Sequence, residues 1–295
     1  MIRKFIYVCL ASLVFTACEK EIKLKDSDIK SRIVVNGLFE TEDTLKIQLS
    51  ESRDILFNNG GVLPDILTGQ AKLLTADNQS IGEFVHEGSG LYYLPNFLPK
   101  PGVEYKLKVN NTGFDEVSAI NKIPASISIS NIDTLRKADY MDIDITFSDN
   151  GNEENYYGIL IIDKGKFEYE IEPGVVVTEY YDNSWVCTKD LNVYGSVDPE
   201  GDICSEGDLL ISDDNFNGSN YTITVKKYMD DNPDTLIVSL RSISADLYKY
   251  KTTLQKYNEV QGNPFGEPVQ VFSNIVNGFG IFAGQSVYTD TIFIK

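Results

Sequence analysis

The sequence has little of what catalytic and metal sites are usually built from. It contains one histidine, His86, in 295 residues, and its four cysteines include no Cys-x-x-Cys pair. A Ser-His-Asp or Cys-His arrangement would have to use that single histidine, and thiolate and imidazole ligands are too few for a typical zinc site. We therefore expect no catalytic residues, no metal site and no cofactor, and we interpret His86 as a surface residue.

Positive charge is also scarce. The chain has 26 Lys and Arg against 44 Asp and Glu, a formal net charge of −18. This balance repels nucleic acid, so we expect no nucleic-acid partner. The abundant acids offer many carboxylate pairs without singling one out, so a hydrolase remains an outlying alternative. The segment from Asp213 to Gly218 begins like a calcium-binding EF-hand loop, but Thr224 stands where a bidentate Glu is needed, and we interpret the segment as a β-turn.

No apolar run is long enough to remain in a membrane. The longest extends from Phe5 to Ala17 and ends at the charged Glu19, whereas a transmembrane helix needs about 20 apolar residues. Arg3 and Lys4 precede the run and small residues end it, which is typical of a signal peptide. We predict that residues 1–17 are a signal peptide that is removed.

Phe15-Thr16-Ala17-Cys18 resembles the lipobox of bacterial lipoproteins. The resemblance implies that Cys18 is acylated and that residues 18–31, which are poor in apolar side chains, form a lipidated tether to the membrane. A plain secretory signal with an accidental cysteine is the alternative. Charges directly after Cys18 also resemble the signals that send some Bacteroidota lipoproteins to the cell exterior, so we expect an outer-membrane protein facing the cell surface.

Two cysteines, Cys187 and Cys204, remain once Cys9 is removed with the signal peptide and Cys18 is acylated. In an oxidising envelope two such residues are candidates for a disulfide. Two unpaired buried thiols are the alternative.

Period-two alternation of apolar and polar residues dominates the rest of the chain, for example at 45–49 and 105–109. This pattern predicts an all-β protein of antiparallel sandwiches. The alternation within residues 32–124 predicts a β-sandwich domain that resembles immunoglobulin-like or transthyretin-like modules. Pro124 marks the boundary between this domain and the next. Residues 125–295 predict a second β-domain, loop-rich over 182–219, with one α-helix near residues 244–260 capped by Ser244.

Two further patterns have alternative interpretations. Tyrosine pairs could stack on a sugar or peptide, but neighbours in a strand point to opposite faces, so we expect half of them in the core. Asp-Thr-aliphatic triplets resemble the acceptor of Bacteroidota O-glycosylation, and turn chemistry explains them equally well. The pairs and triplets begin at Tyr92, Tyr156 and Tyr180, and at Asp43, Asp133, Asp234 and Asp290.

The segment from Gly262 to Val269, followed by Ser273-Asn274-Ile275 and residues 277–282, resembles the C-terminal signature of the Bacteroidota lipoproteins called domain of unknown function 4249. The resemblance extends to residues 33–37 and 90–93. It implies an outer-membrane lipoprotein of the kind found with TonB-dependent transporters. Gly278, Gly280 and Gly284 allow close backbone approach, and we favour a role in shaping the last strands over direct contact with a partner.

These observations favour a non-enzymatic accessory or binding lipoprotein of an outer-membrane TonB-dependent transport system. A structural or adhesive surface protein is the alternative. We expect the transporter to be contacted mainly by the second domain, because its signature combines a Pro-bracketed loop with aromatic residues. The predicted contact residues are Asn263, Pro264, Phe265 and Phe279.

Overall fold

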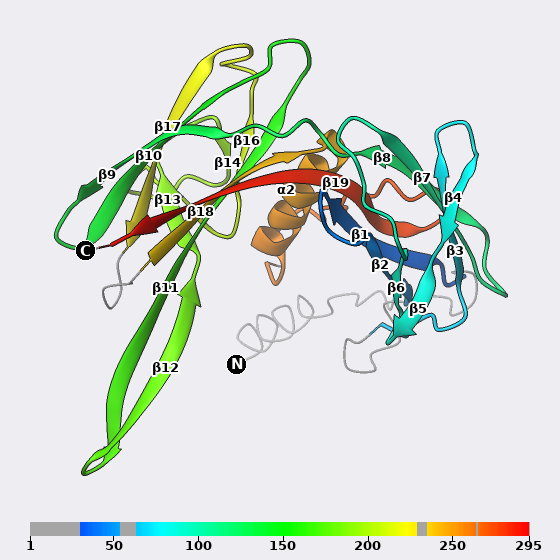
Figure 1. Cartoon of the computed structure of the whole chain (residues 1–295), viewed down its shortest axis with the longest axis horizontal. Coiled ribbons are helices and arrows are strands. Elements are labelled where there is room, and N and C mark those ends of the chain that lie inside the picture. Colours follow the sequence, from blue (N-terminus) through cyan, green and yellow to red (C-terminus); the bar gives the residue numbers. More distant parts are fainter. Residues whose placement is uncertain (1–29, 54–62, 229–234, 264, 295) are drawn as a thin grey trace, which may run out of the picture.

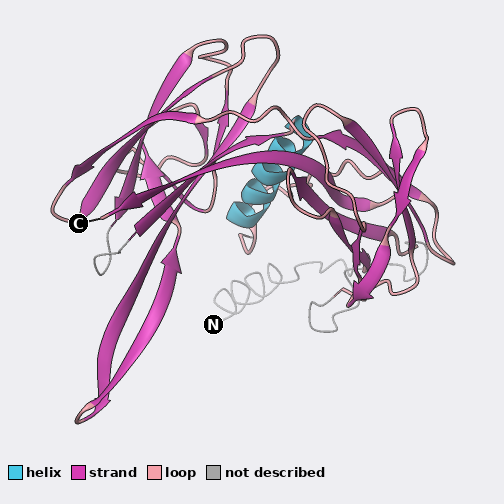
Figure 2. Cartoon of the chain, viewed as in Figure 1, coloured by secondary structure: helices cyan, strands magenta, loops and turns pink. Residues whose placement is uncertain are grey.

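The computed structural model describes residues 30–53, 63–228, 235–263 and 265–294. Within them the protein is all-β with one helix, as predicted, and its strands form three sheets in a sandwich-like arrangement (Figure 2). The predicted signal peptide, Cys18 and most of the tether lie outside the described residues. No helix of the described part is long and apolar enough to cross a membrane.

Eight strands build an N-terminal unit. They are β1 (Ile33–Glu40), β2 (Lys46–Glu51), β3 (Gln70–Thr75), β4 (Ser80–Glu83), β5 (Val85–Gly88), β6 (Leu91–Tyr93), β7 (Glu104–Asn110) and β8 (Val117–Lys122). The sheet β4-β3-β7-β8 packs on β1, β2 and their neighbours, and both contribute to one apolar core. The alternation at 45–49 and 105–109 is confirmed, because its apolar side chains are buried there.

The remaining elements build a C-terminal unit. They are β9 (Ile129–Arg136), β10 (Tyr140–Ser148), β11 (Tyr156–Glu172), β12 (Val175–Asn183), β13 (Trp185–Thr188), β14 (Val193–Tyr194), β15 (Ile203–Glu206), β16 (Leu209–Ser212), β17 (Asn220–Tyr228), β18 (Thr235–Ile243), α2 (Ala245–Val260) and β19 (Phe279–Phe293). The sheet β15-β13-β17-β10-β9 packs on β11, β16 and β18 around a second core. Residues 182–219 were expected to be loop-rich, and most of them do lie in loops and turns. Four strands of two to four residues that were not predicted also lie there, and they are too short to give a clear alternation.

One sheet of ten strands joins the two units. Its order is β14-β16-β11-β18-β19-β1-β2-β6-β5, with β12 paired to β11. Strand β19 pairs antiparallel with β18 along its second half and parallel with β1 along its first half. Figure 1 shows β19 as the long red strand that passes from one unit to the other.

The chain therefore does not divide cleanly at residue 124. All of residues 125–295 were expected in the second domain, whereas Ile275 and Phe282 are buried in the core of the N-terminal unit. The ring of Phe282 lies against that of Phe39, with their centroids 4.6 Å apart. A strand partner so distant in sequence leaves no local pattern from which its pairing could be predicted.

The predicted helix is α2. Its first turn is capped by the side chain of Ser244, which accepts a hydrogen bond from the backbone N–H of Leu247. Its buried face, led by Leu247, packs on Ile243, Ile281 and Ala283. This small third core lies over the middle of the ten-stranded sheet, near the point where the two units meet (Figure 1).

Strands β11 and β12 continue past the edge of the C-terminal unit as a two-stranded hairpin. Figure 1 shows this hairpin projecting away from both units. We call its projecting part, residues 164–183, the arm. Gly174 adopts a φ of +84° at the tip, next to Pro173, a pairing that suits a tight turn.

Candidate functional site

The signature loop that follows α2 is exposed. Asn263 is exposed, and the side chain of Phe265 has 94% of its surface accessible. Pro264 lies outside the described residues. The loop is held by local hydrogen bonds, because the side-chain oxygen of Asn263 accepts from the backbone N–H of Phe265 at 3.0 Å. Two of the predicted contact residues, Asn263 and Phe265, are therefore available on the surface.

The middle of the signature has a packing role. Asn274 donates to the carboxylate of Asp246 in α2 at 2.9 Å and exchanges hydrogen bonds with the backbone of Phe282. Asn121 in β8 donates to the same carboxylate at 3.0 Å and accepts from the backbone N–H of Gly284. One carboxylate thus links the start of the helix to both units.

The glycines of the signature permit close approach between strands. Gly280 has a φ of +100°, and a Cβ added there would lie 2.0 Å from the carbonyl oxygen of Val35 in β1. A Cβ at Gly284 would lie 2.5 Å from the carbonyl oxygen of Lys122. Larger residues would therefore push β19 away from its neighbours, which supports the expected shaping role.

Phe279, the last predicted contact residue, lies apart from Phe265, at the start of β19. It is 42% exposed, and the guanidinium carbon of Arg32 lies 5.2 Å from the centre of its ring. Such a cation on an aromatic face is a favourable contact. Phe279 is thus partly covered by the first described residues of the chain.

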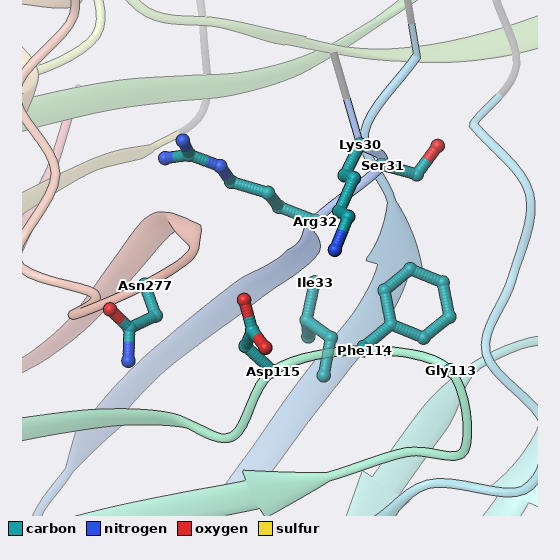
Figure 3. Close-up of a pocket in the computed structure, with 8 residues that line it drawn as sticks. All are labelled: Lys30, Ser31, Arg32, Ile33, Gly113, Phe114, Asp115 and Asn277. Carbon is teal, nitrogen blue, oxygen red and sulfur yellow. The ribbon is translucent and has the colours of Figure 1, made fainter. Parts of the chain in front are cut away.

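A cavity of about 350 Å³ opens beside Arg32, where the predicted tether enters the N-terminal unit. Figure 3 shows the cationic groups of Lys30 and Arg32 pointing in different directions, with Asp115 and Asn277 on the facing loops. The lining residues are Lys30, Ser31, Arg32, Ile33, Gly113, Phe114, Asp115 and Asn277. Two cationic residues, Lys30 and Arg32, thus border this cavity in a strongly acidic chain.

A larger groove of about 590 Å³ lies between α2 and strands β15 and β16 with the short turn that connects them. Trp185 borders it with a partly exposed ring. Asp208 faces α2 and forms ion pairs with Arg241, at 2.9 Å, and with Lys251. The lining residues are Trp185, Cys204, Ser205, Glu206, Gly207, Asp208, Leu210, Lys251, Leu254, Gln255, Asn258 and Glu259. An indole face bordered by amides and carboxylates can bind polar ligands with a flat apolar side.

The expected disulfide lies at the edge of this groove. Cys187 in β13 stands opposite Cys204 in β15, and the two sulfur atoms are joined. The bond cross-links two neighbouring strands of the five-stranded sheet.

One acidic group in the described part of the chain has the spacing to hold a cation: Asp198, Glu200 and Asp202. One carboxylate oxygen of Asp198 and one of Asp202 already have protein partners. Asp198 accepts hydrogen bonds from the backbone N–H groups of Glu200 and Asp202. Lys226 lies 2.6 Å from Asp202, and this hydrogen bond raises the pKa of the lysine. The group is thus an acidic turn neutralised by lysine.

The segment that begins like a calcium loop is a turn. Residues 214–218 form it, and Asp213 is buried with its carboxylate accepting from the backbone N–H of Asn155 at 2.9 Å. Burial raises the pKa of Asp213. The interpretation as a β-turn is therefore confirmed.

His86 is exposed, as expected, and its ring lies 4.9 Å from that of Tyr92. The tyrosine pairs follow the expected division only in part. Tyr92 and Tyr157 are buried, whereas neither member of the third pair, Tyr180 and Tyr181, lies in the core. Burial, then a hydrogen bond to Asp149, raises the pKa of Tyr157.

Two features were missed by sequence reasoning. The first is the arm, which Glu168 and Glu170 could have indicated if the strand had been followed past them. The second is an ion pair between Lys227 and Asp163, both fully buried, with Nζ 2.8 Å from Oδ1. The alternation of β17 could have indicated it, because Lys227 continues at a spacing of two the buried face that includes Ile223 and Val225.

The comparisons with known proteins identify a family. The family described as Domain of unknown function (DUF4249) matches residues 19–291. No curated protein matches the chain. Among solved structures the chain is similar to a Salmonella alpha-2-macroglobulin mutant, at 12% identity and a TM-score of 0.25. That match covers 92% of this chain and 15% of the other, and at this score it carries no argument.

Proposed function

We propose that this chain, which belongs to the family described as Domain of unknown function (DUF4249), is a lipid-anchored outer-membrane protein of Bacteroidota. It acts as a non-enzymatic binding component of a TonB-dependent transport system. The lipobox-like segment before Cys18 supports the anchor, and the family signature supports the association. Binding is the activity that suits two joined sandwiches without a recognised nucleophile or cofactor motif.

The exposure of Phe265 carries the proposal. Asn274, Gly280, Phe282 and Gly284 all have packing roles inside the protein. Phe265 has none, because its ring is 94% exposed. A large aromatic side chain displayed to solvent is typical of a residue that anchors a protein interface. We infer that the loop of residues 262–267 contacts the transporter.

The test is co-purification from mildly solubilised outer membrane with the full-length protein as bait. We expect the transporter to be recovered with the wild type. Phe265→Ser should weaken its recovery, because loss of an interface aromatic costs about 2 kcal/mol, or roughly thirtyfold in affinity. Phe293→Ser is the matched control, since Phe293 is also largely exposed but lies at the far end of β19. Equal recovery with both variants would place the contact elsewhere.

The anchor is tested separately. Cys18→Ala should release the protein from membranes washed with alkaline carbonate, because such a wash also removes proteins that are held only by a protein partner, and acylation would be the direct attachment to lipid. Integral behaviour of this variant, which would persist through the wash, would contradict the proposed anchor. If no transporter is recovered with the anchored wild type, that result would favour the alternative of a structural or adhesive surface protein. The continuous ten-stranded sheet favours that alternative, because it would make the two units a stiff spacer.

A further inference from the structure

The arm has a free edge. Within the described residues β12 pairs only with β11, so the backbone groups along its other side have no strand beside them. Figure 1 shows this edge well separated from the rest of the protein. A long exposed edge strand invites pairing with another chain, and proteins usually protect such edges with charge, proline or a covering segment.

The arm also exposes several large apolar side chains. Ile171, Val176 and Tyr180 are each more than half exposed. Val175 is exposed too, so the edge strand begins with neighbouring apolar residues on both of its faces. A cluster of this kind on a protein surface marks an interaction site more often than it serves stability.

The charge of the arm restricts what can bind there. Residues 164–183 contain five acids and two lysines. Lys164 pairs with Asp182 at 3.6 Å and Lys166 with Glu168 at 3.2 Å. The other three acids are also exposed, with Glu170 and Glu172 near the tip and Glu179 in the middle of β12, where it accepts a hydrogen bond from the hydroxyl of Tyr169 at 2.6 Å. A second copy of this chain, at −18, would be repelled, whereas a basic segment would be attracted.

The root of the arm is fixed in place. The buried ammonium of Lys227 pairs with Asp163 of β11 and donates to the carbonyl oxygens of Asn183, at 2.9 Å, and Trp185, at 3.0 Å. Lys227 therefore ties both strands of the arm to the five-stranded sheet. A binding edge held this way loses little freedom when a partner binds.

We propose that the free edge of β12 binds an extended segment of a partner protein by strand addition. The segment alternates Lys or Arg with apolar residues. Backbone hydrogen bonds to β12 supply affinity, while the glutamates and exposed apolar side chains of the arm select the sequence. This site is separate from the loop at Phe265 and does not depend on the partner proposed there.

The experiment uses the full mature protein and three nine-residue peptides, with binding measured by fluorescence anisotropy. The first peptide alternates Lys with Val and Tyr, the second has Glu in place of Lys, and the third is the basic peptide with a central proline. We expect the basic peptide to bind at least tenfold more tightly than either of the others, because proline prevents strand pairing.

Two matched triple variants locate the binding. Glu170→Gln, Glu172→Gln and Glu179→Gln together should weaken binding of the basic peptide at least tenfold. The control, Glu42→Gln, Glu87→Gln and Glu104→Gln, removes the same charge from exposed positions of the N-terminal unit and should change it less than twofold. Circular dichroism verifies that both variants fold.

Three results would overturn the proposal. If the proline peptide bound as tightly as the basic peptide, strand addition would be excluded. If both triple variants lost the same affinity for the basic peptide, the effect would come from the net charge of the protein and not from the arm. In the Cys18→Ala background, sedimentation with phosphatidylcholine vesicles that Val176→Ser abolishes would assign the arm to a lipid surface instead.

Discussion

The two halves of strand β11 differ in burial: the first half lies in the core of the C-terminal unit, and the second half forms one strand of the exposed arm. In the first half Tyr157, Ile159 and Ile161 are at most 1% exposed, and the strand has neighbours on both sides. In the second half β12 is the main partner and the side chains of Tyr169 and Ile171 are exposed. The change occurs at Asp163 and Lys164, where a nearly continuous apolar run gives way to alternating charges.

This contrast separates stability from recognition within one element. Burial of aliphatic side chains in the first half contributes to folding, at about 25 cal/mol per Å² of apolar surface. The second half gains little of this, since a two-stranded hairpin is at best marginally stable by itself. Substitutions in the two halves should therefore differ sharply in their effect on the free energy of unfolding.

The largest effect is expected where the halves meet. Lys227→Ala leaves Asp163 as an uncompensated buried charge and should lower the free energy of unfolding by about 3–5 kcal/mol. Urea unfolding measures the loss. The double variant Lys227→Met with Asp163→Leu should recover part of it, because it removes both charges but leaves the carbonyl oxygens of Asn183 and Trp185 without their donor. A single variant as stable as the wild type would show that the ion pair does not hold the root of the arm.

The next effect sharpens the contrast directly. Ile161→Ala in the first half opens a cavity in the C-terminal core and should cost about 3 kcal/mol. Ile171→Ala, the same substitution in the arm, should change stability by less than about 0.5 kcal/mol. Both are measured by urea unfolding under the same conditions. Similar losses at the two positions would mean that the arm is packed rather than projecting.

A smaller, pH-dependent effect is expected at Tyr157. Its pKa is raised by burial, so the phenol contributes stability that is fully present below pH 10 and is lost as the pH rises further. Tyr157→Phe should cost about 1 kcal/mol at neutral pH, the worth of a hydrogen bond, and should flatten the alkaline loss. Urea unfolding between pH 7 and pH 12 tests both parts. An unchanged alkaline slope in Tyr157→Phe would assign that loss to other groups.

The smallest effect is expected at the outer strand. Val176→Ser should alter stability by less than about 0.5 kcal/mol, because the side chain is already exposed. It should nevertheless weaken binding of the basic peptide, because it removes an apolar contact. Thermal unfolding measures the effect on stability, and fluorescence anisotropy on the same sample measures the effect on binding. A clear loss of stability without any loss of binding would contradict the proposal, because it would mean that Val176 serves stability and not recognition.

The features that the sequence predicted correctly are those that depend on residues close together in the chain. Alternation at Leu45, Ile47 and Leu49 marked a strand with one buried face, and Ser244 with the apolar spacing after it marked the helix. Asn263 and Phe265 were expected on the surface and are exposed there. In each case the neighbouring residues carry the signal.

What could not be predicted depends on distant partners. The alternation at Glu168 and Glu170 looks the same whether the opposite face is covered or open to solvent. The pairing of Gly280 with Val35 joins positions far apart in the chain, and no spacing within either segment reveals the other. Short strands such as β14 form because they pair with a neighbouring strand, and two residues are too few to show an alternation of apolar and polar side chains.

The parallel pairing of β19 with β1 has a consequence for the order in which the protein forms. Phe282 fills the N-terminal core, yet it is made long after strands β1 to β8 that surround it. The first sandwich cannot close until Phe282 has been made, and contacts of such long range slow folding. Synthesis from the N-terminus therefore does not complete the two units in sequence. Loss of the last strand, by an early stop or by proteolysis, would open the unit that was made first.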